Sequence, residues 1–268
     1  KRPVVVWNIT KACNLKCVHC YAKAVEKKSN GELTHEQGLR LIDDLSDFGS
    51  PVMLFSGGEP LMRPDLVDLA NYAVSKGMRA VISTNGTLIT PGKARELKKV
   101  GLSYVGVSLD GMEEINDRFR GKKSAFKDAM EGIRNCQAVG LKVGLRFTIN
   151  RMNAVEIPRI FDLVEEMEIP RICFYHLVYA GRGSNMVEED LTHHQTRAVV
   201  DLIMDRTRDL HERGKPKEVL TVDNHADGPY IYLRMRREKD PRAEDVLQLL
   251  RMNEGNSSGV GIGCVSWD

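Results

Sequence analysis

Three cysteines, Cys13, Cys17 and Cys20, lie close together in a chain that has six cysteines in all. Thiolates are soft ligands that favour zinc and iron–sulfur clusters. A structural zinc site usually has four paired ligands, and the neighbouring His19 stands between two of the cysteines, where it can hardly reach the same ion. A [4Fe–4S] cluster normally takes four cysteines, so three leave one iron open. The spacing predicts such a cluster, with an iron that can bind a small molecule.

Short polar segments rich in glycine or asparagine follow several apolar runs of strand length. Any one of them is typical of an ordinary turn, because glycine and asparagine tolerate turn conformations. Their repetition, together with the cysteine loop, indicates a functional site. The segments are Ser56-Gly-Gly-Glu-Pro60, Thr84-Asn-Gly86, Leu109-Asp-Gly111 and Ala180-Gly-Arg-Gly183.

The elements that must position these segments alternate between strand and helix. Apolar runs of strand length occur at 4–9, 52–55, 79–83, 104–108, 143–147 and 172–176. Amphipathic helical patterns occur at 34–49, 64–77, 91–101, 124–140 and 153–167. This alternation predicts a parallel sheet with helices outside it, which right-handed crossovers curl towards a barrel. We expect an α/β fold, a partial (β/α)6 TIM-like barrel, with its chemistry at the C-terminal ends of the strands.

The chain continues beyond this core into a C-terminal extension. A long helix is predicted at 192–214, a strand at 219–222 and a further helical pattern that ends near Asn253. A glycine-rich run then enters Cys264. We expect a core domain over residues 1–190 and an extension over residues 191–268. Because the chain begins without methionine and stops without a polar tail, we expect both ends to be cut.

Composition restricts the class of protein. Charged residues make up 28% of the chain and the net charge is only +2, so we expect no nucleic-acid partner. We also expect no membrane partner, because no apolar run approaches the roughly 18 residues of a membrane span and no signal peptide is visible. Cys136 and Cys173 lie in apolar-periodic segments and are expected in the core. A metal-type cysteine cluster without a signal indicates a cytoplasmic protein.

The C-x3-C-x2-C segment, followed by Gly57-Gly-Glu-Pro60 after the next strand, resembles the radical S-adenosylmethionine superfamily over about residues 4–190. The resemblance implies a [4Fe–4S] cluster whose open iron binds S-adenosylmethionine. It also implies an electron donor, because reductive cleavage of this cosubstrate yields methionine and a 5′-deoxyadenosyl radical that takes a hydrogen atom from the substrate. In such an enzyme the protein orients, shields and tunes this chemistry.

The resemblance also implies roles for single residues. The matching positions are Cys13, Cys17 and Cys20 for the cluster, His19 and Leu177 for the adenine, Gly57, Gly58 and Glu59 for the methionine amino group, Ser108 and Asn85 beside the cosubstrate, and Arg146 for a carboxylate. For Arg146 a structural ion pair is the alternative. Glycine lets backbone approach a ligand closely, so we expect Gly58→Val to weaken cosubstrate binding and to leave the cluster assembled.

Three sequence segments in the second half of the chain are similar to those of a narrower group, the radical enzymes of alternative haem and d1-haem biosynthesis. They lie at 174–183, 223–228 and 255–264. Within that group they most resemble didecarboxysiroheme deacetylases, which implies removal of two acetate side chains from a siroheme-derived iron tetrapyrrole to give iron-coproporphyrin. The last of these segments also resembles the start of a SPASM or twitch domain. Cys264 would then be the first ligand of a second, auxiliary iron–sulfur cluster, with a lone thiol as the alternative.

An iron tetrapyrrole that carries several carboxylates calls for a wide apolar slot, cations at its edge and an axial ligand to its iron. Candidate cations are Arg182 and the run Arg234, Arg236 and Arg237, for which a solvated helix face is the alternative. His176 and His225 are candidate axial ligands. The alternative for each is a histidine that is only hydrogen-bonded.

Three other functions stay open. One is a SPASM-type maturase that modifies a peptide or protein. Another is a molybdenum-cofactor-type cyclase, which would need more C-terminal cysteines and a Gly-Gly tail. The third is a non-enzymatic iron–sulfur or haem-binding protein, which would not need the glycine loop at Gly57. Cleavage of S-adenosylmethionine by the reconstituted protein would separate the enzymes from the binding proteins.

Overall fold

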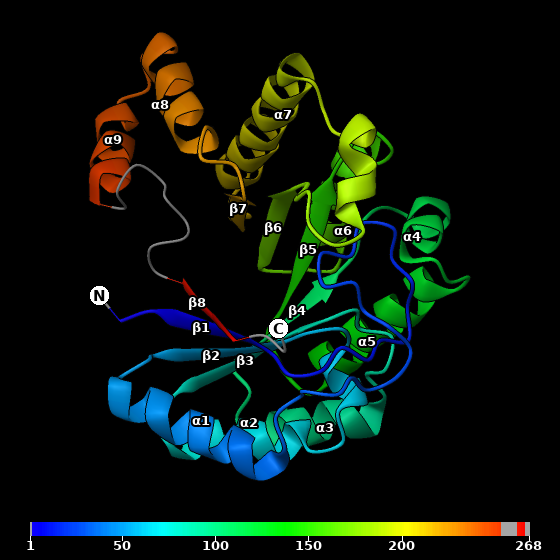
Figure 1. The fold of residues 1–268 in the computed structure, drawn as a ribbon. Helices are drawn as coiled ribbons and strands as arrows, with labels where there is room; N and C mark the ends of the chain where they lie inside the picture. Colours follow the sequence, from blue (N-terminus) through cyan, green and yellow to red (C-terminus); the bar gives the residue numbers. More distant parts are fainter. Residues whose placement is uncertain (1, 253–261, 266–268) are drawn as a thin grey trace.

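The computed structural model describes residues 2–252 and the backbone of residues 262–265. In these residues eight strands form one sheet in the order β7-β6-β5-β4-β3-β2-β1-β8, and every neighbouring pair is parallel. The sheet curls into an open barrel with helices outside it (Figure 1). The strands are β1 (Val4–Asn8), β2 (Val52–Ser56), β3 (Arg79–Thr84), β4 (Tyr104–Ser108), β5 (Val143–Ile149), β6 (Arg171–His176), β7 (Glu218–Val222) and β8 (Ile262–Val265).

The helices follow the strands in the order that the sequence predicts, with additions. They are α1 (His35–Phe48), α2 (Leu66–Ser75), α3 (Pro91–Lys99), α4 (Glu113–Arg120), α5 (Ala125–Ala138), α6 (Ile157–Glu166), α7 (His193–Glu212), α8 (Asp227–Arg237) and α9 (Ala243–Met252). The first helix shows why the predicted ends are accurate. Thr34 and Gln37 form a capping box at its start, and Gly49 ends it in a left-handed conformation with φ 83°, as such caps require.

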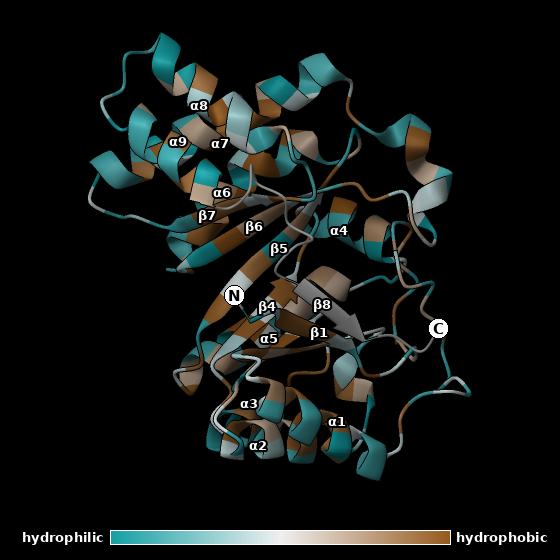
Figure 2. Cartoon of the chain, turned by 60° about the vertical axis from the view of Figure 1, so that its left-hand side comes forward, coloured by the Kyte–Doolittle hydropathy of each residue, from teal (hydrophilic) through white to brown (hydrophobic). Residues whose placement is uncertain are grey.

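The core lies between the sheet and the helices that cover it. The strands are largely brown in Figure 2, whereas the helices around them carry both teal and brown residues. Trp7 and Phe55 from neighbouring strands are buried, with ring centroids 6.0 Å apart. Gly38 allows α1 to lie directly on Trp7, because a Cβ there would lie 2.7 Å from the indole Cη2. This packing holds α1 against β1 and β2 in the barrel wall.

The predicted partial barrel is confirmed, and the structure adds to it at both edges. β7 pairs with β6 and β8 pairs with β1. Both added strands come from the segment after residue 190, so the extension supplies the two edges of the sheet. The division of the chain into domains at residue 190 stays a prediction.

Two details of the helices differ from the sequence prediction. α4 was not predicted, and the single helical pattern expected up to Asn253 is two helices, α8 and α9. Pro241 lies between these two helices, and proline cannot continue a helix because it lacks the backbone N–H group.

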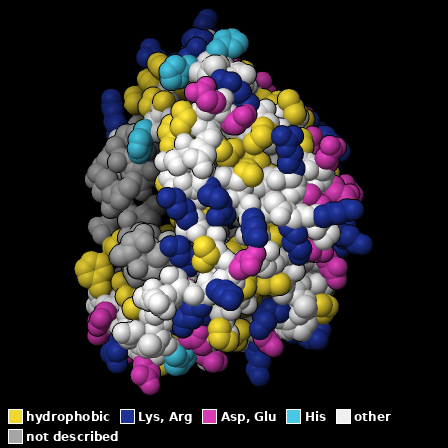
Figure 3. Space-filling model, turned by 45° about the vertical axis from the view of Figure 1, so that its right-hand side comes forward, with side chains coloured by type: hydrophobic (Ala, Val, Ile, Leu, Met, Phe, Trp, Pro, Cys, Tyr) yellow, Lys and Arg dark blue, Asp and Glu magenta, His cyan; other side chains and the backbone are white. Residues whose placement is uncertain are grey.

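The surface shows no obvious separation of charge on the face drawn in Figure 3, where Lys and Arg side chains are interspersed with Asp and Glu. Within residues 2–252, no helix is both long and apolar enough to cross a membrane.

Candidate active site

The cysteine loop follows β1 and lies at the C-terminal edge of the sheet. Cys13 and Cys17 are buried and Cys20 is half-buried. All three line one cavity of about 350 Å³, whose other walls come from the ends of β2 to β6. This volume lies within the range of small-molecule sites.

The same cavity gathers most of the residues that the sequence marked as candidates. Besides the cysteines, it is lined by His19, Gly57, Gly58, Asn85, Ser108, Arg146, His176, Leu177 and Arg182. Glu59 and His225 do not line it, and the side chain of Cys264 lies outside the described residues. The convergence follows from the parallel sheet, because the C-terminal ends of its strands share one edge.

Hydrogen-bond donors point at the cysteine sulfurs. The backbone N–H of Leu15 donates to Cys13 Sγ at 3.4 Å, and that of Ala24 donates to Cys20 Sγ at 3.4 Å. Asn85 Nδ2 lies 3.9 Å from Cys13 Sγ. Such donors stabilise negative charge on sulfur, and the thiolate is the form that binds metal.

The chemistry of the thiols fits a cluster better than a single ion. Burial raises the pKa of Cys13 to about 12 and also raises the pKa of Cys17, so these thiols need a nearby cation to ionise; a coordinating metal supplies one. Among the described residues, no three His, Cys, Asp or Glu side chains converge closely enough to hold one ion. A [4Fe–4S] cluster does not need that convergence, because each cysteine binds a different iron.

A buried ion pair stands behind Cys17. Arg120 Nη1 donates to Cys17 Sγ at 3.7 Å, and Arg120 Nη2 contacts the carboxylate of Asp110. Asp110 is fully buried and accepts a hydrogen bond from the backbone N–H of Thr148 at 2.7 Å. Removing one partner of such a pair leaves an uncompensated buried charge, so the pair fixes the guanidinium beside the sulfur. The sequence marked Asp110 only as part of a turn and gave no sign of Arg120, which lies on α4.

His19 is held as a neutral ring at the cavity wall. Its ring stacks on that of Phe119, with centroids 4.4 Å apart and an interplanar angle of 22°. Burial lowers the pKa of His19 to about 4, so the imidazole is uncharged at neutral pH. Its Nδ1 is buried without a hydrogen-bond partner among the described residues. A neutral ring with a nitrogen to satisfy is compatible with a nucleobase, and the adenine contact stays a prediction.

The glycine loop after β2 is bonded to the cysteine loop. The backbone N–H of Gly58 donates to the carbonyl of Thr10 at 2.6 Å. A Cβ on Gly58 would lie 2.3 Å from the carbonyl oxygen of Ala12, far inside van der Waals contact. The expectation that Gly58→Val leaves the cluster assembled is therefore corrected. The clash falls on the backbone of the cysteine loop itself.

Glu59 lies behind this loop and not in the cavity wall. Its buried carboxylate accepts hydrogen bonds from Thr84 Oγ1 at 2.7 Å, from the backbone N–H of Asn85 at 2.8 Å and from that of Leu61 at 3.1 Å. The side chain thus ties the β2 loop to the end of β3. Within this loop, Gly57 and Gly58 are the residues that face the cavity, so the predicted contact with the methionine amino group depends on their backbone.

The loop after β6 clamps the cysteine loop. Arg182 Nε donates to the carbonyl of Cys17 at 2.7 Å and Arg182 Nη1 donates to that of Ala24 at 2.9 Å. The backbone N–H of Arg182 donates to the carbonyl of Cys20 at 2.9 Å. Arg182 Nη2 is buried and has no partner among the described residues. Arg182 Nη2 therefore remains for a ligand, and the predicted role of Arg182 as a cation for substrate carboxylates stays a prediction.

Arg146 turns into the cavity from β5. Its guanidinium lies over the ring of Tyr175 at 4.6 Å from the centroid, and its backbone is in register with that of Ser108. Among the described residues it makes no structural ion pair, which was the alternative. Because Arg146 forms no ion pair with a carboxylate in the described part of the protein, its guanidinium is suited to bind a carboxylate of a ligand.

The two candidate axial histidines differ in position. His176, at the end of β6, lines the cavity, and its Nε2 lies 2.8 Å from the carboxylate of Asp227 at the start of α8. His225 is exposed. Asp227 was missed by the sequence reasoning, although the segment that contains it had been singled out.

The other candidate cations lie on α8 and do not line the cavity. Arg234 is bound by three carboxylates, those of Asp201, Asp205 and Glu238. Arg236 and Arg237 are exposed. In the described structure these three arginines therefore form a charged face of α8, which was the alternative to a role in substrate binding.

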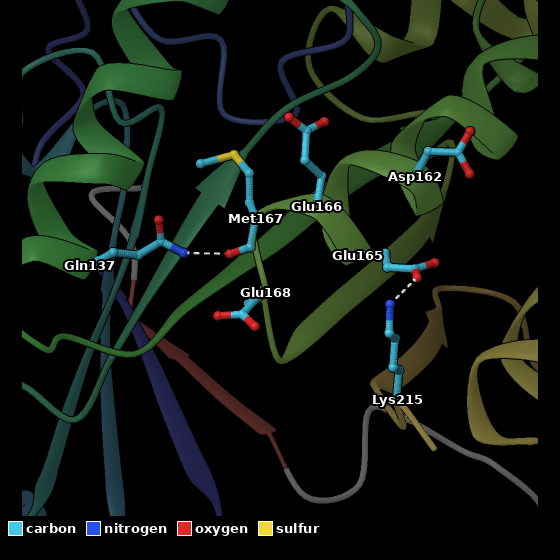
Figure 4. A pocket seen from close by; sticks show the side chains of 7 residues that line it. All are labelled: Gln137, Asp162, Glu165, Glu166, Met167, Glu168 and Lys215. Carbon is cyan, nitrogen blue, oxygen red and sulfur yellow. Dashed lines mark hydrogen bonds and ion pairs between the residues drawn. The ribbon is translucent and has the colours of Figure 1, made fainter. Parts of the chain in front are cut away.

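A second hollow of about 930 Å³ lies at the other end of the sheet (Figure 4). It is formed where α6 ends and leads into β6, which is the N-terminal end of that strand. Lys215 Nζ donates to Glu165 and Gln137 Nε2 donates to the carbonyl of Met167, both at 2.7 Å. None of its lining residues was marked by the sequence, and it contains no cysteine or histidine.

Comparison with known proteins is consistent with this geometry. The sequence profile of the family described as "Radical SAM superfamily" matches residues 7–164. The chain is 66% identical over 268 residues to Fe-coproporphyrin III synthase of Methanosarcina barkeri, covering 100% of this chain and 67% of that protein. It is 41% identical over 265 residues to pre-heme d1 synthase of Dinoroseobacter shibae, covering 97% and 65%. The chain thus spans about two thirds of the length of these relatives.

Solved structures show the same fold. The crystal structure of Streptococcus suis SuiB bound to the precursor peptide SuiA superposes with a TM-score of 0.73 at 19% identity, covering 87% of this chain and 51% of that one. At this identity the likeness concerns the fold alone.

Proposed function

The chain belongs to the radical S-adenosylmethionine superfamily, and we propose that it removes acetate side chains from a siroheme-derived iron tetrapyrrole in haem biosynthesis, as a didecarboxysiroheme deacetylase. As a member of this superfamily it is an enzyme that uses a [4Fe–4S] cluster and S-adenosylmethionine. The substrate and the reaction on it are the proposal.

The observation that carries the proposal is the 66% identity to a protein named Fe-coproporphyrin III synthase, which extends over the whole of this chain. Iron-coproporphyrin is what removal of two acetate side chains from didecarboxysiroheme leaves. The identity includes the segments after β6 and β7, which contribute Leu177, Arg182 and Asp223 to the cavity wall.

The resident groups supply a 5′-deoxyadenosyl radical when they are bound and an external donor provides an electron. The residues that would hold them line one cavity: Cys13, Cys17 and Cys20 as cluster ligands, and the backbone at Gly57 and Gly58 for the methionine end. Burial of Cys13 and Cys17 limits the access of water to these two sulfurs.

The cavity is also lined by residues to which no role toward these groups is assigned. Tyr175, His176 and Asp223 line it at the edge formed by β6 and β7. We assign this side, with the extension after residue 190, to the tetrapyrrole. The auxiliary cluster at Cys264 remains a prediction for the part of the protein beyond the described residues.

The test is anaerobic incubation of the reconstituted protein with S-adenosylmethionine, a reductant and didecarboxysiroheme, followed by mass spectrometry of the tetrapyrrole. The expected product is iron-coproporphyrin III, formed in wild-type protein and absent in a Cys13→Ala/Cys17→Ala/Cys20→Ala variant. An unchanged tetrapyrrole mass in the presence of an assembled cluster that cleaves S-adenosylmethionine would rule out this reaction.

A further inference from the structure

We propose that His176, oriented by Asp227, binds the iron of the tetrapyrrole substrate as its axial ligand through Nδ1. This inference rests on the proposed function and deepens it, because it names the atom that holds the substrate. It depends on three observations, which concern the hydrogen bond of the ring, its position and the charge around it.

The first observation is the hydrogen bond. His176 Nε2 lies 2.8 Å from Asp227 Oδ2, and the other oxygen of that carboxylate accepts from Asn224 Nδ2 at 2.8 Å. A carboxylate has no proton to give at neutral pH, so Nε2 is the protonated nitrogen. In the neutral form of the ring, Nδ1 then carries the lone pair. Histidines that bind metals characteristically donate their other N–H group to a carboxylate, which fixes the tautomer and raises the basicity of the ligand.

The second observation is where the ring lies. His176 is the last residue of β6 and lines the cavity, with its side chain 12% exposed, whereas Asp227 is 3% exposed and does not line the cavity. Asp227 begins α8, where the helix dipole favours a negative charge. The carboxylate is therefore a fixed support, and the imidazole is the group of this pair that can reach a ligand.

The third observation is the charge around the ring. Asp223 lines the same cavity, and the parallel register pairs Tyr175 with Val222, which brings Asp223 beside His176 at the next position. Asp223 and Asp227 thus flank the imidazole. Arg146, one of the cations that line the cavity, lowers the pKa of Asp223 against the larger effect of burial, which raises it. Negative surroundings disfavour a substrate carboxylate at His176 and favour a cation. The iron is the cation of the proposed substrate, and imidazole is a ligand well suited to iron.

The experiment uses the full chain with its cluster reconstituted and S-adenosylmethionine present, but without reductant. The oxidised [4Fe–4S] cluster has no unpaired spin, so the electron paramagnetic resonance spectrum of added ferric didecarboxysiroheme can be read directly. Wild-type protein should give the low-spin spectrum of an iron with a nitrogen axial ligand, together with a shifted Soret band. His176→Gly should lose both features, and added imidazole should restore them.

The affinities of the variants for the iron form and for the metal-free form of the tetrapyrrole provide the controls. His176→Gly should bind the iron form at least about 10-fold more weakly, and Asp227→Asn about 10–100-fold more weakly, as supporting residues of a metal ligand do. His225→Ala, an exposed histidine from the same segment, should behave like wild type. Metal-free didecarboxysirohydrochlorin should bind wild type and His176→Gly equally, which shows that the variant is folded and that the iron is what it fails to hold.

The outcomes separate the inference from the proposed function. If ferric didecarboxysiroheme binds wild type and His176→Gly with the same affinity and the same spectrum, the axial role is overturned and the tetrapyrrole substrate survives. If neither the iron form nor the metal-free form binds wild-type protein, the proposed function fails and the axial role fails with it.

Discussion

Arg120 Nη1 donates a hydrogen bond to Cys17 Sγ at 3.7 Å, although 103 residues separate the two in the sequence. Of the donors that reach the three cysteine sulfurs in the described structure, this is the charged one. The charge of Arg120 is balanced by the fully buried carboxylate of Asp110. The pair places a charged donor at Cys17, whereas the donors at Cys13 and Cys20 are neutral.

The first prediction follows from this contact. Arg120→Met in an Asp110→Asn background, which avoids a lone buried carboxylate, should make the reduction potential of the cluster more negative, because the lost donor favours the more negatively charged reduced state. A hydrogen bond to a charged group contributes about 1.5–3 kcal/mol, and about 59 mV corresponds to a tenfold change for one electron. We expect a decrease of up to roughly 130 mV.

Redox titration followed by electron paramagnetic resonance measures this potential independently of turnover. Arg118→Met is the matched control, because Arg118 lies on the exposed face of the same helix. Equal potentials in the Arg120 variant and in wild type would show that the contact is only structural.

The second prediction concerns Gly58→Ala. A Cβ there would lie 2.3 Å from the carbonyl oxygen of Ala12, so the cysteine loop must move. We expect iron content and the absorbance of the cluster to fall together with S-adenosylmethionine binding. Gly92→Ala on α3 is the control, since its Cβ would meet only Thr90 Oγ1 at 3.8 Å. A Gly58→Ala protein that holds a full cluster would contradict the close approach.

The third prediction concerns the clamp formed by Arg182. Arg182→Ala removes the hydrogen bonds to the carbonyls of Cys17 and Ala24, so the cysteine loop should open more readily. We expect faster loss of iron to a chelator, followed by absorbance, whereas Arg236→Ala on the exposed face of α8 should lose iron at the wild-type rate. Identical rates for the two variants would mean that the clamp does not hold the cluster.

The fourth prediction concerns stability. Glu59→Ala leaves the donors of Thr84, Asn85 and Leu61 without their acceptor. A buried donor without a partner costs about 1–3 kcal/mol, so the free energy of unfolding should fall by roughly 3 kcal/mol or more. Urea unfolding followed by circular dichroism measures it. Glu131→Ala, at an exposed position of α5, should stay within about 0.5 kcal/mol of wild type, and a similarly small change for Glu59→Ala would refute the bridging role.

Much of the fold could be predicted from the sequence because its signals are local. Thr34 and Gly49 mark the two ends of α1 by their capping chemistry, and short apolar runs mark the strands. α4 was missed because it is short and polar and has no side-chain cap at Met112. β8 was not predicted as a strand, and its segment was described only as a glycine-rich run before Cys264. It pairs with β1, which lies more than 250 residues earlier in the sequence, and no local sequence pattern indicates such a pairing.

The site was predictable where one segment carries the chemistry, as with Cys13, Cys17 and Cys20. It was not predictable where two segments meet only in the fold. Arg120 beside Cys17 and Asp227 beside His176 are such cases. Their partners lie on elements that the barrel brings together, and charged residues on a helix give no sign of which one turns inward.

The central claim is that this radical enzyme acts on an iron tetrapyrrole, and the most direct test is formation of 5′-deoxyadenosine under reducing conditions. Didecarboxysiroheme should raise the rate above the substrate-free rate in wild-type protein, and the Cys13→Ala/Cys17→Ala/Cys20→Ala variant should form none. The account would be contradicted if didecarboxysiroheme had no effect on the rate while a peptide raised it.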